Sequence, residues 1–182
     1  MSPLIVALVG RSRSGKDTVA STLVSTGRFR LLRMAAPIKA ATSALFGIDA
    51  DAFENASKDS QHPAFCSKTP KSPRDAMVWL TAITKEWLGV DDFFAHRLLE
   101  TARASEVDVI IPDVRYVADA AMVRKHGGLI VKIRRPVEAG GTTSPWESEV
   151  DDIDPDFEIV NDGSLQSLEA AAMAILLRRP TN

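Results

Sequence analysis

A glycine- and lysine-containing segment near the N-terminus has the residue types and spacing that bind phosphate. It reads Gly10-Arg11-Ser12-Arg13-Ser14-Gly15-Lys16-Asp17-Thr18. Glycine permits positive φ, so such a loop can turn its backbone N–H groups toward one anion. The lysine adds a mobile positive charge that can accompany a phosphoryl group during transfer. The pattern predicts that residues 11–18 hold a phosphate-bearing cofactor.

Asp17 departs from the usual pattern, which has serine or threonine directly after the lysine. That hydroxyl normally ligates Mg²⁺, and a carboxylate could hold the ion directly or through water. Alternatively, Asp17 is an acid in the first turn of a helix, where the helix dipole favours it, and Thr18 supplies the hydroxyl. The residues leave both interpretations open.

A second group of charged residues follows two later apolar runs. Asp113 and Arg115 come after the first run, and the pair Arg134-Arg135 comes after the second. The carboxyl ends of parallel strands meet at one edge of a sheet, where ligands bind. An acid there can hold Mg²⁺ through its water shell, and arginines can neutralise a transferring phosphoryl group. We therefore expect these side chains near the loop, with a helix cap as the alternative role of Asp113.

Alternating strands and helices must position these groups. Residues 4–9 are apolar and mostly β-branched, which is typical of a strand buried on both faces. Similar runs predict strands at 29–35, 107–113, 129–133 and 157–161. Helices are predicted at 16–26, 37–46, 73–88, 92–105 and 116–126, and a last one is predicted to begin after Ser164. The order indicates an α/β fold with a five-stranded parallel sheet and helices on both faces.

Two segments interrupt this alternation. Residues 49–71 are polar and without periodicity, so we expect a long loop there. The helix predicted after it carries an apolar stripe formed by Ala76, Leu80, Ile83 and Trp87. Residues 137–155 are Gly-rich and acidic, which is typical of a mobile lid that excludes water. We expect one domain, 1–182, with an insertion at 48–104 and a lid at 137–155.

The composition narrows the class of protein. The chain has 182 residues, which is enough for one domain with a hydrophobic core. Its net charge is −2, so it has no broad basic surface that could bind a nucleic-acid polymer. No apolar run reaches the length of a membrane span. The single Cys66 allows no disulfide within the chain, which suits the cytoplasm. We expect a cytoplasmic protein whose partners are small molecules.

Five motifs occur in the order found in phage-type deoxynucleoside monophosphate kinases, which the chain resembles over nearly its whole length. They are the loop at 10–18, Ala-Pro-Ile-Lys at 36–39, Pro-Asp-Val-Arg at 112–115, Arg-Arg-Pro at 134–136 and Asn-Asp-Gly-Ser-Leu at 161–165. The family shares the aspartate after the loop lysine. The resemblance implies a three-layer P-loop NTPase fold whose helical insertion binds the acceptor. It also implies ATP- and Mg²⁺-dependent phosphorylation of deoxynucleoside 5′-monophosphates to diphosphates for DNA synthesis, in the host cytoplasm if the protein is viral.

The resemblance also implies roles for individual residues. Lys16 and the loop backbone would hold the ATP phosphates, with Asp113 near the metal. Arg115 would lie near the donor or acceptor phosphate, and Arg134 or Arg135 would come from the edge of the lid. Arg74 would meet the acceptor phosphate, with Lys39 as a weaker candidate.

Two departures from the family concern the acceptor. Trp146 stands where the family often has histidine, and Leu80-Thr81 replaces the Leu-Gln that follows Arg74 in the family. The accepted base is therefore open. The aromatic residues that could stack on it are Phe53, Phe65, Trp79 and Trp146, and for Trp79 we expect core packing instead. Animal-type phosphomevalonate kinases share the Ser-Gly-Lys-Asp loop and the Asp-x-Arg pair. A kinase for phosphomevalonate or dephospho-coenzyme A, and a non-enzymatic nucleotide-binding module, are the alternatives. Small kinases of this kind are often dimers, so the resemblance admits a homodimer.

Overall fold

A computed structural model of the chain describes residues 2–65, 71–90, 92–136 and 149–177. Its centre is a sheet of five parallel strands in the order β2-β3-β1-β4-β5. The strands are β1 (Ile5–Val9), β2 (Phe29–Leu31), β3 (Asp108–Ile111), β4 (Leu129–Arg134) and β5 (Phe157–Val160). The predicted α/β fold is confirmed. Among the described residues, no helix combines the length and the apolar character that crossing a membrane requires.

The chain divides into two compact units, Met1–Met34 with Leu99–Asn182, and Ala35–Leu98. The first unit contains the sheet together with α1 (Lys16–Ser25), α5 (Val117–Lys125) and α6 (Leu165–Met173). The described part of the second contains α2 (Ala36–Phe46), short 3₁₀ segments and α3 (Pro73–Leu88). Helix α4 (Phe93–Arg103) begins in the second unit and ends in the first. The second unit overlaps most of the insertion expected at 48–104, but it begins earlier in the chain.

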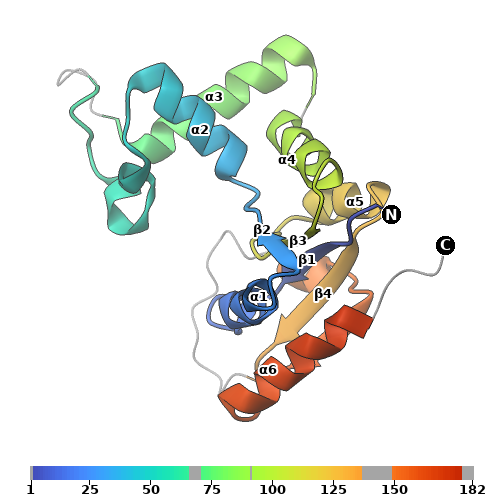
Figure 1. Cartoon of the computed structure of the whole chain (residues 1–182). Helices are drawn as coiled ribbons and strands as arrows, with labels where there is room; N and C mark the ends of the chain where they lie inside the picture. Colours follow the sequence, from blue (N-terminus) through green and yellow to red (C-terminus); the bar gives the residue numbers. More distant parts are fainter. Residues whose placement is uncertain (1, 66–70, 91, 137–148, 178–182) are drawn as a thin grey trace. The chain divides into compact units, whose positions relative to one another are not determined.

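The first unit has three layers, with the sheet between two layers of helices, and its hydrophobic core holds them together. Even-numbered residues of β1, such as Val6 and Leu8, are fully buried in one cluster with Leu23 of α1 and Leu168 of α6. Helices α1 and α6 therefore cover one face of the sheet, and α5 packs against β1 and β4 from the other side (Figure 1). All five residues of β1 are buried, as expected for a central parallel strand. This packing holds the carboxyl end of β1, where the loop begins, on a rigid base.

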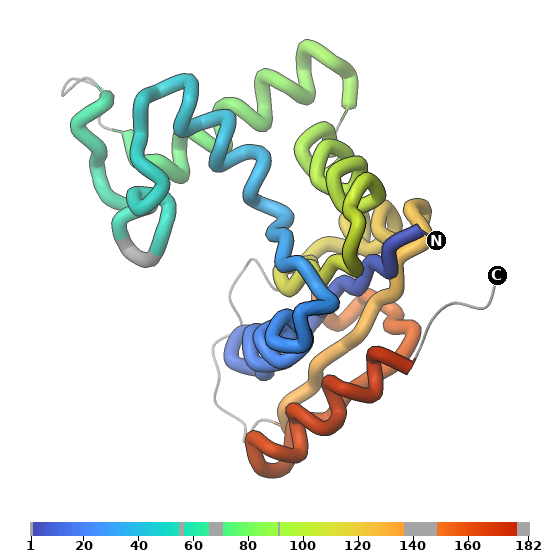
Figure 2. The backbone as a smooth tube through the Cα atoms, viewed as in Figure 1, coloured from blue at the N-terminus to red at the C-terminus, as the bar shows by residue number. Residues whose placement is uncertain are grey.

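The segment 49–71 differs from the expected long loop. It contains the 3₁₀ helices η1 (Ala50–Phe53) and η2 (Asn55–Asp59). Figure 2 draws this part of the chain, in teal, as a folded excursion after α2. Phe53 is 1% exposed, and η1 contacts both α2 and α3. Phe53 is thus a core residue of the second unit and not a free surface for stacking a base. Short 3₁₀ turns held by one buried aromatic residue leave no periodic pattern in a sequence.

Helix α3 begins as the sequence predicts, but its apolar stripe is not buried. Ser72 and Asp75 form a reciprocal capping box at its start. Along the stripe Ala76 is 4% exposed, whereas Ile83 is 40% and Trp87 83% exposed. The stripe is therefore exposed along the C-terminal half of the helix, and the expectation that Trp79 packs in the core is wrong, because its side chain is 49% exposed. In the described part of the second unit, α2, η1 and η2 pack against α3, and they bury only its first turns.

Strand β3 begins with a buried acid, which gives a test of the fold. Asp108 accepts hydrogen bonds from the Leu4 N–H and from Arg28 Nε, both at 2.8 Å. We expect Asp108→Ala to lower the free energy of unfolding by about 2 kcal/mol, because a buried amide and a guanidinium lose their acceptor. Urea unfolding measures this. The neighbouring exposed Glu106→Ala should change stability by less than about 0.5 kcal/mol, and equal losses would contradict the role of Asp108.

Candidate phosphate-binding site

The loop between β1 and α1 is closely packed at both of its glycines. Gly10 has φ 154° and Gly15 has φ 107°. A Cβ on Gly10 would lie 2.3 Å from the Ile133 carbonyl oxygen, and one on Gly15 would lie 2.8 Å from Asn161 Nδ2. Helix α1 begins directly after Gly15, and no side chain caps it. The first N–H groups of α1 are therefore in position to bind an anion.

The side chains of the loop fold back onto it. Lys16 Nζ donates to the carbonyl oxygens of Gly10 and Arg11, at 2.6 and 2.7 Å. Ser14 is 2% exposed, and its hydroxyl finds no hydrogen-bond partner in the part of the chain that the structure describes. Arg13 has φ 61°, which is uncommon for a residue other than glycine. Strain and an unsatisfied buried hydroxyl in one loop are features of functional sites.

Asn161 anchors this loop to the connection between β5 and α6. Its Nδ2 donates to the Ser14 carbonyl oxygen at 2.9 Å, and its backbone N–H donates to the Arg134 carbonyl oxygen at 2.7 Å. The sequence shows this residue only within a family motif and does not reveal its contact with the loop. Hydrogen bonding to Ser14 fixes the backbone just before Gly15.

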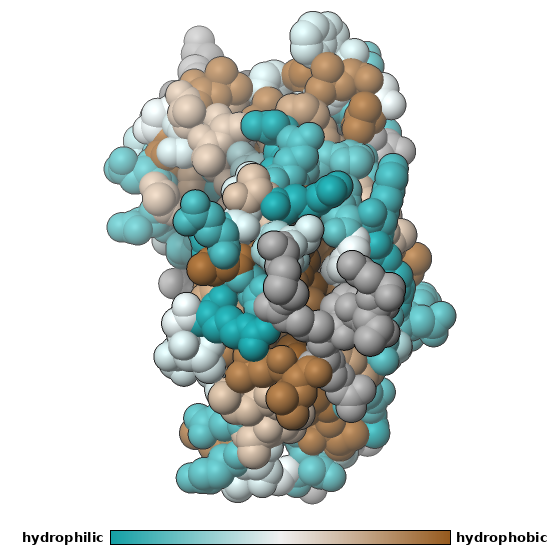
Figure 3. Space-filling model, turned by 45° about the vertical axis from the view of Figure 1, so that its right-hand side comes forward, coloured by the Kyte–Doolittle hydropathy of each residue, from teal (hydrophilic) through white to brown (hydrophobic). Residues whose placement is uncertain are grey.

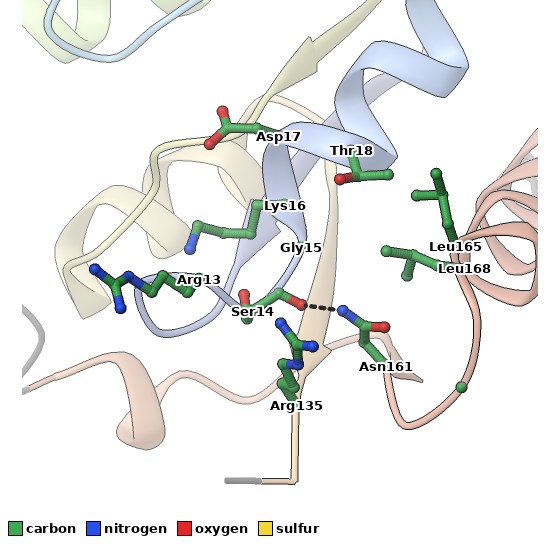
Figure 4. A pocket seen from close by; sticks show the side chains of 11 residues that line it. Arg13, Ser14, Gly15, Lys16, Asp17, Thr18, Arg135, Asn161, Leu165 and Leu168 are labelled. Carbon is green, nitrogen blue, oxygen red and sulfur yellow. Dashed lines mark hydrogen bonds between the residues drawn. The ribbon is translucent and has the colours of Figure 1, made fainter. Parts of the chain in front are cut away.

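A pocket of about 370 Å³ opens beside the loop (Figure 4). The residues that line it are Arg13, Ser14, Gly15, Lys16, Asp17, Thr18, Arg135, Asn161, Gly163, Leu165 and Leu168. Figure 4 shows Thr18 facing the two leucines of α6, while Arg135 lies beside Ser14 and Asn161. Leu165 belongs to the apolar stripe of α6 in the sequence but is 57% exposed, because it forms the wall of this pocket. The pocket therefore combines an apolar wall, cationic groups and the mouth of the loop.

Parallel pairing brings the other predicted residues to the same edge of the sheet. Val9 at the end of β1 pairs with Lys132, and Ala7 pairs with Ile111, so β3 and β4 end beside the loop. Arg135 follows β4 and lines the pocket, whereas Arg134 Nε pairs with Glu158 Oε1 at 2.5 Å. The structure thus separates the two arginines that the sequence leaves equivalent.

Asp113 and Arg115 follow β3 at this edge. Asp113 is half-buried, and its Oδ1 accepts the Met34 N–H at 2.9 Å. It therefore braces the connection that follows β2. Arg115 is exposed just before α5. Neither residue lines the pocket described above.

Asp17, Thr18 and Asp113 are the described residues near the loop that could hold Mg²⁺. Asp17 has an 84% exposed side chain, 3.5 Å from the Arg33 guanidinium, and Thr18 lines the pocket. Within the described ranges, no set of three or more His, Cys, Asp or Glu residues could form a metal cage. Mg²⁺ commonly binds through one or two carboxylates together with substrate phosphates. Asp17 at the loop and Asp113 at the sheet edge fit that kind of partial site.

Other expected ligands have partners of their own. The Arg11 guanidinium pairs with Asp151 in the 3₁₀ segment η4 (Val150–Asp152), and Ser12 is exposed in the loop. In the second unit, Lys39 Nζ lies 2.6 Å from Glu54 Oε1, and Arg74 pairs with Asp59. The hydrogen bond from Arg74 holds the pKa of Asp59 below its usual value. Residues 137–148, most of the expected lid and including Trp146, lie outside the described residues.

A carboxyl group that the sequence analysis did not single out stands near Asp113. Asp119 lies in the first turn of α5, and its pKa is raised to about 6. Burial is the main cause of this net shift, the backbone N–H groups of Tyr116 and Arg115 oppose it, and the negative charges of Asp113 and Glu149 add to it. Glu149 itself accepts the Val117 N–H at 3.0 Å. The end of the expected lid and the end of β3 therefore meet at the start of α5.

Asp119 gives a prediction on pH. Its pKa rises from 3.8 to about 6 on folding, so the folded state binds a proton that the unfolded state releases between these values. Its contribution to stability must fall as pH rises through that window. We expect Asp119→Asn to remove this fall and to stabilise the protein at pH 7.5 by about 2 kcal/mol. Urea unfolding across pH measures the difference from wild type. The exposed Asp154→Asn should leave the profile unchanged, and a wild-type profile in Asp119→Asn would contradict the assignment.

Comparisons with known proteins bear on the fold and on the class of this protein. No protein-family model matches the chain. A protein of Acanthamoeba polyphaga mimivirus, named "Putative deoxynucleotide monophosphate kinase", is 26% identical over 180 residues, covering 90% of this chain and 91% of its own length. Its similarity therefore extends through both units.

Solved structures show the same fold at low sequence identity. TT1252 from Thermus thermophilus superposes with a TM-score of 0.55, 18% identity and coverage of 97% of this chain and 98% of its own. Dephospho-CoA kinase from Campylobacter jejuni gives a TM-score of 0.54, 14% identity and 95% coverage of both chains. The Mycobacterium tuberculosis APS kinase CysC, in complex with AMPPNP and APS, gives 0.50, 14% identity and coverage of 97% and 99%.

The parallel sheet and its glycine-lysine loop define a P-loop protein with the fold of small kinases. Within that class the chain is similar, at 26% identity, to the mimivirus protein named as a deoxynucleotide monophosphate kinase.

Proposed function

We propose that the protein transfers the γ-phosphoryl group of ATP to a deoxynucleoside 5′-monophosphate. The observation that carries the proposal is the uncapped start of α1 and Lys16, opening onto a pocket of about 370 Å³. A polyphosphate at the loop and a nucleoside in the pocket together match the chemistry of ATP. The similarity to the mimivirus protein along both units supports the choice of acceptor.

The pocket suits the nucleoside half of the donor. Leu165 and Leu168 offer an apolar surface for a base, and Asn161 and Arg135 offer polar groups beside it. Its volume lies in the range of small-molecule sites, which are about 300–1,000 Å³. The kinase neighbour in complex with AMPPNP supports ATP as the donor.

Transfer to a monophosphate needs little acid–base chemistry. The acceptor oxygen is already anionic near neutral pH, so it attacks the γ-phosphorus directly while the bond to the β-phosphate oxygen breaks and ADP leaves. Catalysis then consists of positioning and charge neutralisation. Lys16 would exchange the carbonyl oxygens of Gly10 and Arg11 for phosphate oxygens, and Arg135 would neutralise charge from the pocket side. Asp17 and Asp113 would hold Mg²⁺, which when bound would supply positive charge that neutralises the transferring phosphoryl group.

The acceptor phosphate would be met by Arg115 at the sheet edge and by Arg74 and Lys39 of the second unit. Arg74 and Lys39 are paired with Asp59 and Glu54, so an anionic acceptor must compete with these carboxylates. A phosphate dianion carries more charge than either carboxylate, which favours the exchange. In this proposal residues 48–104 bind the acceptor, and residues 137–155 close over the site as a lid within one kinase domain.

A coupled assay for ADP with ATP and a panel of acceptors tests the proposal. The panel contains the four deoxynucleoside monophosphates, their ribose counterparts, phosphomevalonate and dephospho-coenzyme A. We expect turnover that depends on a deoxynucleoside monophosphate and on the identity of its base. Turnover only with phosphomevalonate or dephospho-coenzyme A would replace the acceptor. ATP binding without acceptor-dependent turnover would leave only a nucleotide-binding module.

A further inference from the structure

Residues 149–153 form a short segment of the first unit, which we call the bridging segment. Two of its side chains are buried, Val150 at 1% and Ile153 at 2% exposed. Lys132 of β4 donates from its Nζ to the carbonyl oxygens of Asp151 and Ile153, at 3.2 and 3.5 Å. Buried side chains and backbone contacts with β4 therefore hold this segment in place.

Two acids of the bridging segment contact two different parts of the phosphate site. The Asp151 carboxylate pairs with the Arg11 guanidinium of the phosphate-binding loop. Glu149 Oε2 accepts the N–H of Val117, the first residue of α5, at 3.0 Å. Hydrophobic residues that reach the surface of the first unit belong to other elements, such as α6, and Figure 3 shows brown residues in the lower part of the view, where Figure 1 draws α6. The bridging segment thus meets its neighbours through charge.

Arg11 is the residue through which Asp151 acts on the loop. The carbonyl oxygen of Arg11 accepts Lys16 Nζ at 2.7 Å and the Ser14 N–H at 3.2 Å. A guanidinium held by Asp151 restricts the position of this carbonyl group, and so the direction of the Lys16 side chain. The hydrogen bond from Arg11 holds the pKa of Asp151 below its usual value, so the pair stays charged at neutral pH.

Glu149 acts on the turn that carries Arg115. The Val117 N–H that it accepts lies two residues after Arg115, and Tyr116 provides no side-chain cap for α5. The Asp119 carboxylate accepts the N–H groups of Tyr116 and Arg115. Three successive N–H groups at the start of α5 therefore meet carboxylates, which satisfies them and fixes the backbone from which the Arg115 side chain extends.

We propose that Asp151 and Glu149 are positioning residues of the phosphate site. Asp151 sets the loop through Arg11, and Glu149 sets Arg115 through the start of α5. A carboxylate that met a phosphate directly would repel it, so these acids act through a guanidinium and a backbone N–H instead. The inference rests on the proposed function, because it requires that the loop binds ATP and that Arg115 meets a phosphate. It also changes the role expected for Arg11, from a phosphate ligand to a group that fixes the loop.

A double-mutant cycle tests the contact between Asp151 and Arg11. The measurement is titration with a fluorescent ATP analogue in the absence of an acceptor. The two side chains are 56% and 45% exposed, so we expect Asp151→Ala and Arg11→Ala each to weaken binding by about three- to five-fold. The double variant should bind no more weakly than either single variant, because both changes remove the same interaction. Asp152→Ala changes an exposed acid of the same segment and should bind like the wild type.

The opposite result has a distinct signature. If Arg11 bound a phosphate itself, Asp151→Ala would release it, and this variant would bind the ATP analogue as tightly as the wild type or more tightly. That outcome, or a double variant that binds more weakly than both single variants, would overturn the role of Asp151. A wild type that bound no ATP analogue would overturn the proposed function, and this inference with it.

Turnover with ATP and the best deoxynucleoside monophosphate tests the contact made by Glu149. Glu149→Ala should lower kcat about 10-fold, because Arg115 is no longer held in place, and should leave the affinity for the ATP analogue unchanged. Glu149→Gln keeps an oxygen that accepts the Val117 N–H, so it should retain most of the wild-type kcat. A merely stabilising contact would lower the free energy of unfolding without this split between kcat and ATP affinity. Wild-type kcat in Glu149→Ala, or an equal loss in both variants, would overturn the role of Glu149.

Discussion

Replacing Lys16 with alanine is expected to lower phosphoryl transfer at least about 1,000-fold while the fold survives. The Lys16 ammonium is held across the loop mouth by the carbonyl oxygens of Gly10 and Arg11, where a phosphate would lie. Its removal takes away a positive charge at the place where negative charge moves during transfer. The measurement is turnover with ATP and the best acceptor from the panel.

The control for this variant is Lys125→Ala, which removes an exposed lysine in the last turn of α5. It should keep wild-type turnover, and both variants should keep wild-type circular dichroism. If Lys16→Ala turned over as fast as Lys125→Ala, the loop would not be the catalytic centre.

Gly10→Ala is expected to abolish ATP binding and to lower the free energy of unfolding by about 3 kcal/mol. The added methyl group would lie 2.3 Å from the Ile133 carbonyl oxygen, and Gly10 has φ 154°. Ile133 belongs to β4, which pairs with β1 and β5, so its backbone cannot move away without breaking the sheet. The loop must move instead, and its N–H groups then lose their common direction. Titration with a fluorescent ATP analogue and urea unfolding measure the two effects.

Gly27→Ala separates the collision from backbone strain. Gly27 follows α1 with φ 73°, but a Cβ there would meet nothing within 4 Å. This variant should cost about 1 kcal/mol from strain and keep ATP binding. Loss of ATP binding in Gly27→Ala would mean that general destabilisation, and not the geometry of the loop, explains the effect at Gly10.

The parts of the fold that the sequence predicts are those whose chemistry is local. A central parallel strand must be apolar on both faces, so the apolar run that contains Val6 and Leu8 can be recognised as such a strand from the sequence. The loop needs glycine at two positions because no side chain fits there, and Gly10 and Gly15 meet that requirement. Caps such as Ser72 and Ser164 act on residues three positions away, so they too can be read from the sequence.

The features that the sequence does not predict depend on contacts between distant residues. Leu165 has the periodicity of a buried residue, but the pocket keeps it exposed. Asp119 looks like any acid in a first helical turn until burial raises its pKa to about 6. The bond from Asn161 to the Ser14 carbonyl oxygen spans most of the chain and leaves no local pattern. Helical periodicity shows that the stripe with Trp87 is apolar, but not whether anything covers it.

In the proposed function, the loop at the start of α1 holds ATP and passes its terminal phosphoryl group to a second phosphate. The most direct measurement follows the label from [γ-³²P]ATP when the protein is incubated with a deoxynucleoside monophosphate. We predict labelled deoxynucleoside diphosphate in amounts equal to the ADP formed. Label released as inorganic phosphate, or label that stays in ATP with every acceptor, would contradict transfer to a nucleotide.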